Sequence, residues 1–129
     1  MTAKVLVEAS EHILTITFNR ADKLNALDPE SYHLLAQALH RLQHDDDLRV
    51  GVILADGKHF TAGLELDKWA PIFAQGGAPQ MAAGEIDPYG ISGETLSKPL
   101  IIAVHGLCYT SGLELLLNTD IRLGTADTR

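Results

Sequence analysis

Glu114 is an acid in an otherwise leucine-rich segment, flanked by Leu113 and by the leucines at 115–117. Turn-forming and small residues, HGLCYTSG, come directly before this segment at positions 105–112. A carboxylate at the start of a predicted helix can act as a general acid or base. It can also cap the helix, because Ser111 and Glu114 have the spacing of a capping box, in which the glutamate accepts a hydrogen bond from the serine N–H.

A second turn rich in small residues, GKHFTAGLELD, occupies positions 57–67. It follows the apolar stretch 50–55, just as the turn at 105–112 follows the apolar stretch 100–104. Ligands bind at the carboxyl ends of parallel strands in α/β sheets, so two such turns can aim backbone N–H groups at one point. That arrangement is an oxyanion hole, in which the loss of one donor costs about 3 to 4 kcal/mol.

The elements that must position these turns follow from hydrophobic periodicity and turn residues. Segments 4–9 and 12–18 are β-branched and partly alternating, which predicts a hairpin around Ser10-Glu11. Asp28 followed by Pro29 predicts the start of a helix of about four turns, which ends at the polar run 44–47. Further elements are expected in chain order: a buried strand at 50–55, a second at 100–104, a short helix at 111–118 and a strand at 121–124.

Residues 71–93 are rich in glycine and proline, which favours a long irregular excursion that acts as a lid or binding loop. The order strand, helix, strand in both halves indicates an α/β fold with crossover connections.

Composition limits the classes of function. The 129 residues are 46% hydrophobic, which is typical of one globular domain. Seventeen acidic and 10 basic residues give a net charge of −7, which argues against nucleic acid or an anionic membrane as the main partner. A single cysteine and the absence of a leader-like segment favour a reducing, cytoplasmic location. No apolar run approaches the ~20 residues that span a bilayer.

Four stretches together resemble the enoyl-CoA hydratase/isomerase, or crotonase, superfamily: NRADKLNAL (19–27), HFTAGLELD (59–67), KPLIIAVHG (98–106) and SGLELLLNTDIRLGTADTR (111–129). They cover most of the chain in the family's order and correspond to roughly the N-terminal half of a member. The resemblance implies a crotonase-like spiral of β-β-α units, with one core domain over residues 1–129. It also implies that the C-terminal helical region is absent, and that the full-length form is a homotrimer or hexamer.

The resemblance implies roles for particular residues. The family binds acyl-CoA thioesters and stabilises the thioester enolate with two backbone N–H groups, here those of Leu64 and Ser111. Glu114 matches the first of the two glutamates with which hydratases act on water, and the second would lie beyond Arg129. This role and the capping box exclude each other, because a capped Ser111 N–H is not free for an enolate.

Coenzyme A contacts can be assigned in the same way. Ala62 matches the position whose backbone touches the adenine, and four residues match the stretch that lines the CoA arm: Asp22, Lys23, Leu24 and Ala26. Coenzyme A is then part of the substrate, and no metal or other cofactor is implied. On electrostatic grounds, Arg20, Lys23 and Lys58 could supply positive charge to the CoA phosphates of this acidic protein.

The implied activity is hydration of a 2-enoyl-CoA in fatty acid metabolism. An isomerase that moves the double bond, and a non-catalytic acyl-CoA-binding or structural member, remain alternatives. The chain departs from the family at three places: Thr110-Ser111-Gly112 replaces three glycines, His105 stands where asparagine is common, and Glu65 where aspartate is common. The first departure leaves backbone donors but reduces the room for a thioester.

Other groups could do chemistry but have simpler interpretations. Cys108 and His105 lack a third orienting group, so we favour core packing for the cysteine. Ser111 lacks the flanking glycines of a hydrolase elbow. His40 and His44 could hold a metal, but spacing specifies no third ligand, which favours a solvated helix end.

Trp69 and Phe73, four residues apart, either anchor the excursion to the core or contact an acyl chain.

Overall fold

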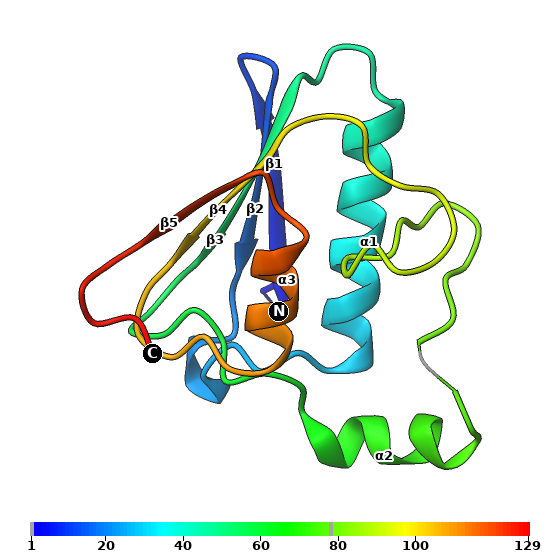
Figure 1. Cartoon of the computed structure of the whole chain (residues 1–129), viewed down its shortest axis with the longest axis vertical. Coiled ribbons are helices and arrows are strands. Elements are labelled where there is room, and N and C mark those ends of the chain that lie inside the picture. Colours follow the sequence, from blue (N-terminus) through cyan, green and yellow to red (C-terminus); the bar gives the residue numbers. More distant parts are fainter. Residues whose placement is uncertain (1, 78) are drawn as a thin grey trace.

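The structure is a computed structural model that describes residues 2–77 and 79–129. One five-stranded sheet has the order β1-β2-β3-β4-β5 (Figure 1). The antiparallel hairpin is formed by β1 (Val5–Ser10) and β2 (Ile13–Phe18), and the parallel strands β3 (Val50–Ala55), β4 (Leu100–Val104) and β5 (Ile121–Gly124) follow. The predicted strands and hairpin are confirmed, with the turn one residue later, at Glu11-His12.

The helix α1 (Pro29–His44) lies along one face of the sheet (Figure 1). The predicted start is confirmed, because the Asp28 side chain accepts a hydrogen bond from the Ser31 N–H at 2.8 Å. Between α1 and the sheet lies the core, in which full burial of an aliphatic side chain contributes about 1.5–3 kcal/mol. It includes side chains from the helix and from three strands: Leu35, Leu39 and Leu42 with Ile16, Ile53 and Ile102.

A short 3-10 helix, η1 (Ala21–Lys23), precedes α1, and a helix that the sequence did not reveal, α2 (Leu66–Ala74), follows β3. The expectation that irregular structure begins at Pro71 is therefore wrong for its first four residues, since Pro71 lies inside α2. Burial of the Trp69 side chain stabilises α2 by more than the missing hydrogen bond of Pro71, which has no N–H, destabilises it. The rest of the expected excursion, as far as the structure describes it, is irregular, and so are the residues from its end to β4. Residues 75–77 and 79–99, here termed the α2–β4 connection, contain no helix or strand.

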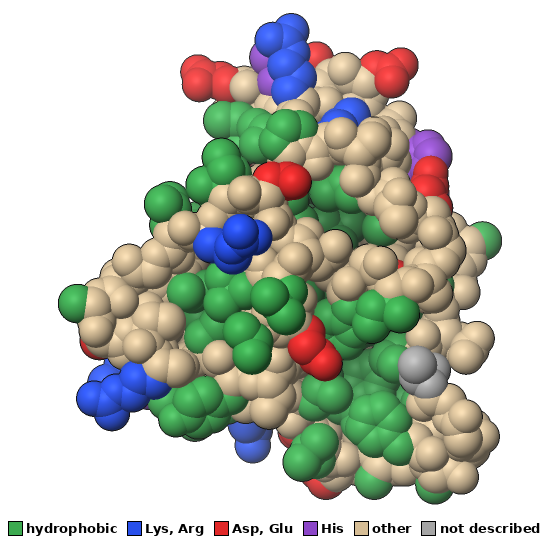
Figure 2. All heavy atoms as spheres, in the orientation of Figure 1, with side chains coloured by type: hydrophobic (Ala, Val, Ile, Leu, Met, Phe, Trp, Pro, Cys, Tyr) green, Lys and Arg blue, Asp and Glu red, His purple; other side chains and the backbone are tan. Residues whose placement is uncertain are grey.

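The last helix, α3 (Ser111–Leu117), ends one residue earlier than predicted, with Asn118 as its C-cap. Large apolar side chains stay exposed on α3 and on β5: Leu113, Leu117, Ile121 and Leu123. Figure 2 shows hydrophobic side chains gathered on this side of the molecule, over α3 and α2. Among the described residues, no helix is both long and apolar enough to cross a bilayer.

Candidate active site

The two turns that follow β3 and β4 are paired through their backbones. The Thr61 N–H donates to the Leu107 carbonyl at 3.0 Å, and the Tyr109 N–H donates to the Thr61 carbonyl at 3.1 Å. The turns therefore continue the parallel pairing of the two strands beyond the sheet. This confirms that they meet at the carboxyl end of the strands, which is where α/β proteins bind ligands.

The N–H of Leu64 is oriented by its neighbours. The Leu27 N–H donates to the Gly63 carbonyl at 2.9 Å, and the Glu65 N–H donates to the Leu27 carbonyl at 3.0 Å. Since the backbone groups of residues 63 and 65 both bond to Leu27, the N–H of Leu64 between them points away from Leu27. Within residues 2–77 and 79–129, no hydrogen bond uses this N–H.

The Ser111 N–H is likewise without an acceptor in the described chain. Ser111 is the first residue of α3, and Thr110, with φ 44°, is the N-cap and makes no side-chain cap bond. The helix start is closed by backbone bonds from Gly112 to Tyr109 and from Glu114 to Thr110. The capping box between Ser111 and Glu114 is not formed, and the Glu114 side chain is exposed instead.

A glycine is required where the two turns touch. Gly63 has φ 101°, and a Cβ added there would lie 2.1 Å from Thr110 Oγ1 and 3.2 Å from the Tyr109 carbonyl oxygen. Gly63 directly precedes Leu64 and Thr110 directly precedes Ser111, so the two unbonded N–H groups belong to neighbouring parts of one site. The threonine in place of a family glycine has not removed the donor.

Asn25 and Thr61 shape this site, although sequence reasoning did not single them out. The buried Asn25 amide donates to the carbonyls of Asp56 and His59 at 2.8 and 2.9 Å. Thr61 Oγ1 donates to the Asn25 carbonyl at 2.6 Å and accepts from the Gly63 N–H at 3.1 Å. The available signal was asparagine's tolerance of positive φ, which Asn25 adopts at 52°.

The stretch expected to line the CoA arm lies beside Ala62, because the Ala62 N–H donates to the Leu24 carbonyl at 3.0 Å. Asp22, Lys23 and Leu24 are exposed, while Ala26 is half-buried. The structure therefore brings together the two segments that the family resemblance assigned to coenzyme A.

Arg20 does not fit the expected role of a phosphate contact. Its guanidinium forms ion pairs with Glu65 at 2.9 Å and with Asp28 at 3.8 Å, and donates to the Ala26 carbonyl at 2.8 Å. The side chain is only 15% exposed, so the expectation for Arg20 is corrected: it is a structural cation. The acid at position 65, unusual for the family, is its partner.

Tyr89 enters the site from the α2–β4 connection, and the sequence analysis missed it. Its hydroxyl lies 2.5 Å from Ser111 Oγ. Burial, followed by the negative charge of Glu114 and its hydrogen-bond acceptance, raises the pKa of Tyr89 to about 12, although the Ser111 hydroxyl acts the other way. Asp87 fixes the turn by accepting from the Tyr89 N–H and the Tyr32 hydroxyl, both at 2.9 Å.

Aromatic rings form a row behind this tyrosine. Ring centroids are 5.3 Å apart for Tyr89 and Tyr32, 5.4 Å for Tyr32 and Trp69, and 5.7 Å for the stacked pair Trp69 and Phe73. Trp69 is fully buried and its indole N–H donates to the Leu27 carbonyl at 2.8 Å, which confirms it as an anchor. Phe73 is 42% exposed and can meet a ligand.

Cys108 packs in the core, as predicted. Burial raises the pKa of its thiol, and that disfavours a nucleophilic thiolate. His105 instead hydrogen-bonds the Gly57 carbonyl through Nε2 at 2.7 Å, which ties the second turn to the first.

The fold and the paired turns define a class of protein that comparison identifies. A family model described as enoyl-CoA hydratase/isomerase matches residues 8–128. The chain belongs to this family, and its mixed α/β fold is that of crotonases. It resembles the crystal structure of a probable enoyl-CoA hydratase/isomerase from Mycobacterium abscessus, with a TM-score of 0.92 and 36% identity over 98% of this chain and 48% of that one.

Curated relatives include proteins named as hydratases and proteins named as isomerases. The (E)-benzylidenesuccinyl-CoA hydratase of Thauera aromatica is 32% identical over 97% of this chain and 48% of its own length. Enoyl-CoA hydratase EchA19 of Mycobacterium tuberculosis is 34% identical over 92% and 45%. The mouse mitochondrial Delta(3,5)-Delta(2,4)-dienoyl-CoA isomerase is 30% identical over 95% and 40%. The chain thus spans about half the length of the curated relatives it matches.

Proposed function

We propose that the protein carrying this chain hydrates a 2-enoyl-CoA thioester. One observation supports the proposal above the others: two backbone N–H groups, of Leu64 and Ser111, have no acceptor within the described residues and belong to turns that touch. Glu114 follows Ser111 by three residues, so the two residues lie on the same face of α3.

The proposed mechanism assigns each group one task. The Glu114 carboxylate takes a proton from water as the water oxygen attacks the β-carbon of the substrate. The electron pair of the carbon–carbon double bond moves toward the thioester, whose oxygen becomes negative. The N–H groups of Leu64 and Ser111 donate to that oxygen. Transfer of the proton held by Glu114 to the α-carbon completes the addition of water and restores the carboxylate.

Coenzyme A would be held as part of the substrate, without a further cofactor. The Ala62 backbone and the neighbouring stretch from Asp22 to Ala26 would contact it. Lys23 and Lys58 would face its phosphates, since neither forms an ion pair within the described chain. We also retain a homotrimer or hexamer as the proposed assembly of the complete protein.

Isomerisation of the double bond is the second candidate. A dienoyl-CoA isomerase is among the relatives at 30% identity, and an isomerase would use the same two N–H donors on the same enolate. An isomerase would rely on an acid in the part of the protein beyond Arg129. The two reactions also differ in the proton that is removed, which comes from water in hydration and from carbon in isomerisation.

The experiment is to incubate the protein at its full encoded length with a 2-enoyl-CoA and a 3-enoyl-CoA and to analyse products by mass. Hydration adds one water, whereas isomerisation leaves the mass unchanged. Glu114→Gln should lower turnover about 1000-fold, because general acid–base groups contribute ~10²–10⁴-fold. Glu8→Gln, at an exposed acid of β1, is the matched control. Coenzyme A binding without any turnover would favour a non-catalytic acyl-CoA-binding protein.

A further inference from the structure

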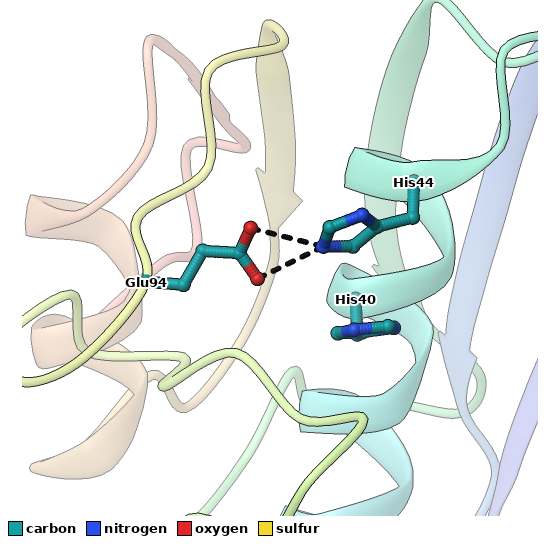
Figure 3. Close-up of side chains that lie close together, drawn as sticks. All are labelled: His40, His44 and Glu94. Carbon is teal, nitrogen blue, oxygen red and sulfur yellow. Dashed lines mark hydrogen bonds and ion pairs between the residues drawn. The ribbon is translucent and has the colours of Figure 1, made fainter.

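His40 and His44 lie one turn apart on α1, and their rings stack with centroids 4.2 Å apart. His44 Nε2 contacts both carboxylate oxygens of Glu94 at 2.9 Å, and in Figure 3 the Glu94 carboxylate points at the His44 ring, with the His40 ring beside it on α1. The His40 side chain makes no hydrogen bond or ion pair with any described residue. Sequence spacing specified no third group beside the two histidines, and the structure places Glu94 there, from the α2–β4 connection.

The backbone that carries Glu94 is held against α1 on both sides of it. Downstream of Glu94, the Gln43 amide donates a hydrogen bond to the Ser97 hydroxyl at 2.8 Å. The Ser97 N–H donates in return to the Gln43 side-chain oxygen at 2.7 Å. Upstream, the Ile86 N–H donates to the Ala36 carbonyl at 3.1 Å. These contacts fix the connection next to the helix, so the approach of Glu94 to the histidines is a property of the fold.

The three side chains have the chemistry of a transition-metal site. One ligand atom from each lies within 4.8 Å of the others, and among the described residues this is the only such grouping. Metal bonds of about 2.0–2.2 Å would need these ligand atoms to move closer to one another by rotation of the side chains. His44 and Glu94 are 50% and 44% exposed and free to make that adjustment.

The ligand set and the local charge select the class of ion. Two imidazole nitrogens and a carboxylate suit late first-row divalent ions, whereas Mg²⁺ and Ca²⁺ prefer oxygen ligands throughout. The acidic run Asp45–Asp47 follows His44 directly and adds negative potential that favours a cation.

We propose that His40, His44 and Glu94 bind one divalent cation of the Zn²⁺ class and so link α1 to the α2–β4 connection. The same connection carries Tyr89, so the ion would fix the segment that reaches Ser111. The site is separate from the two paired turns and does not depend on the proposed hydration.

The test is calorimetric titration of the protein at its full encoded length with Zn²⁺. We expect one ion per chain in the wild type, an affinity at least tenfold weaker in His40→Ala and in His44→Ala, and a smaller loss in Glu94→Gln. His33→Ala is the matched control. His33 lies on the same helix and also pairs with a glutamate of the α2–β4 connection, Glu85, at 2.9 Å, but no second histidine lies beside this pair. This control should bind Zn²⁺ like the wild type.

A second measurement separates a built site from scattered surface binding. Co²⁺ should give a saturable visible absorption band at one equivalent that disappears in His40→Ala, while the circular dichroism of that variant shows an intact fold. Zn²⁺ should also raise the melting temperature of the wild type but not of His44→Ala. Zn²⁺ affinity unchanged by His40→Ala and His44→Ala, or lost equally in His33→Ala, would overturn the proposal.

Discussion

The hydroxyl oxygens of Tyr89 and Ser111 lie 2.5 Å apart and join the α2–β4 connection to the helix start whose N–H we assign to the oxyanion hole. Tyr89 is also close enough to Glu114 for the carboxylate to raise the pKa of the tyrosine. The connection therefore contributes a polar group to the site, in addition to covering the core.

Tyr89→Phe should lower the proposed turnover about tenfold, because it removes a hydroxyl that helps to orient Ser111 and Glu114. Steady-state kinetics at one pH measure the loss.

Ser111→Ala provides the comparison, because it removes the same hydroxyl contact and keeps the backbone N–H. The double variant should cost little more than either single change, as expected for partners in one hydrogen bond. Fully additive losses would show that the two hydroxyls act separately.

Gly63→Ala should destabilise the protein by about 2 kcal/mol or more. An alanine is strained at φ 101°, and its Cβ would lie 3.2 Å from the Tyr109 carbonyl oxygen, so the paired turns must separate. Urea unfolding measures the loss. Gly76→Ala is the control, because Gly76 also has positive φ, at 88°, but nothing lies within 4 Å of its added Cβ. If both variants lose the same stability, contact between the turns contributes nothing.

Asp28→Asn tests a charge at the start of α1. Burial alone would raise the pKa of Asp28, but hydrogen bonds from Lys4 and Ser31 and the charge of Arg20 lower it to about 2. A carboxyl whose folded pKa is depressed stabilises the fold above its unfolded pKa, so this stabilisation, about 2 kcal/mol, is present at neutral pH. It should fade as the pH falls from about 4 to about 2.

The variant keeps a good N-cap residue, so it removes the charge more than the cap. Unfolding free energies of wild type and variant should differ at pH 7 and converge near pH 2. A difference that stays constant across this range would assign the effect to packing.

Arg20→Gln and Lys58→Gln should separate a structural cation from one that faces coenzyme A. Loss of Arg20 leaves the partly buried Glu65 without its partner and leaves Asp28 with Lys4 alone, so it should lower the melting temperature. Loss of Lys58 should instead raise the dissociation constant for coenzyme A, with an effect that shrinks at high salt. Calorimetry and thermal melting distinguish the two outcomes.

The sequence was sufficient for the elements whose signals are local. Asp28-Pro29 marked the start of α1, and the apolar runs marked β3 and β4, because capping and burial act through neighbouring residues. The helix α2 was missed because Pro71 and the glycines after it signal a loop, whereas burial of Trp69 against α1 decides the outcome. Local pattern could not reveal that long-range contact.

The candidate site was predictable in part for the same reason. The two glycine turns could be located from the strands before them, and Glu114 from its leucine neighbours. Tyr89 could not, because it contacts Ser111, more than twenty positions away, and Asn25 offered only its tolerance of positive φ. Arg20 was misassigned because the sequence gives its charge but not its partner Glu65, forty-five residues later.

The pairing of Leu27 with Gly63 and Glu65 has a consequence for how this site can change over time. The donor at position 64 belongs to the main chain and is aimed by main-chain bonds, as is the donor at position 111. Mutation can therefore alter the side chains at both places without removing either donor. The side chains around the site can therefore change in evolution while the two backbone N–H donors stay in place.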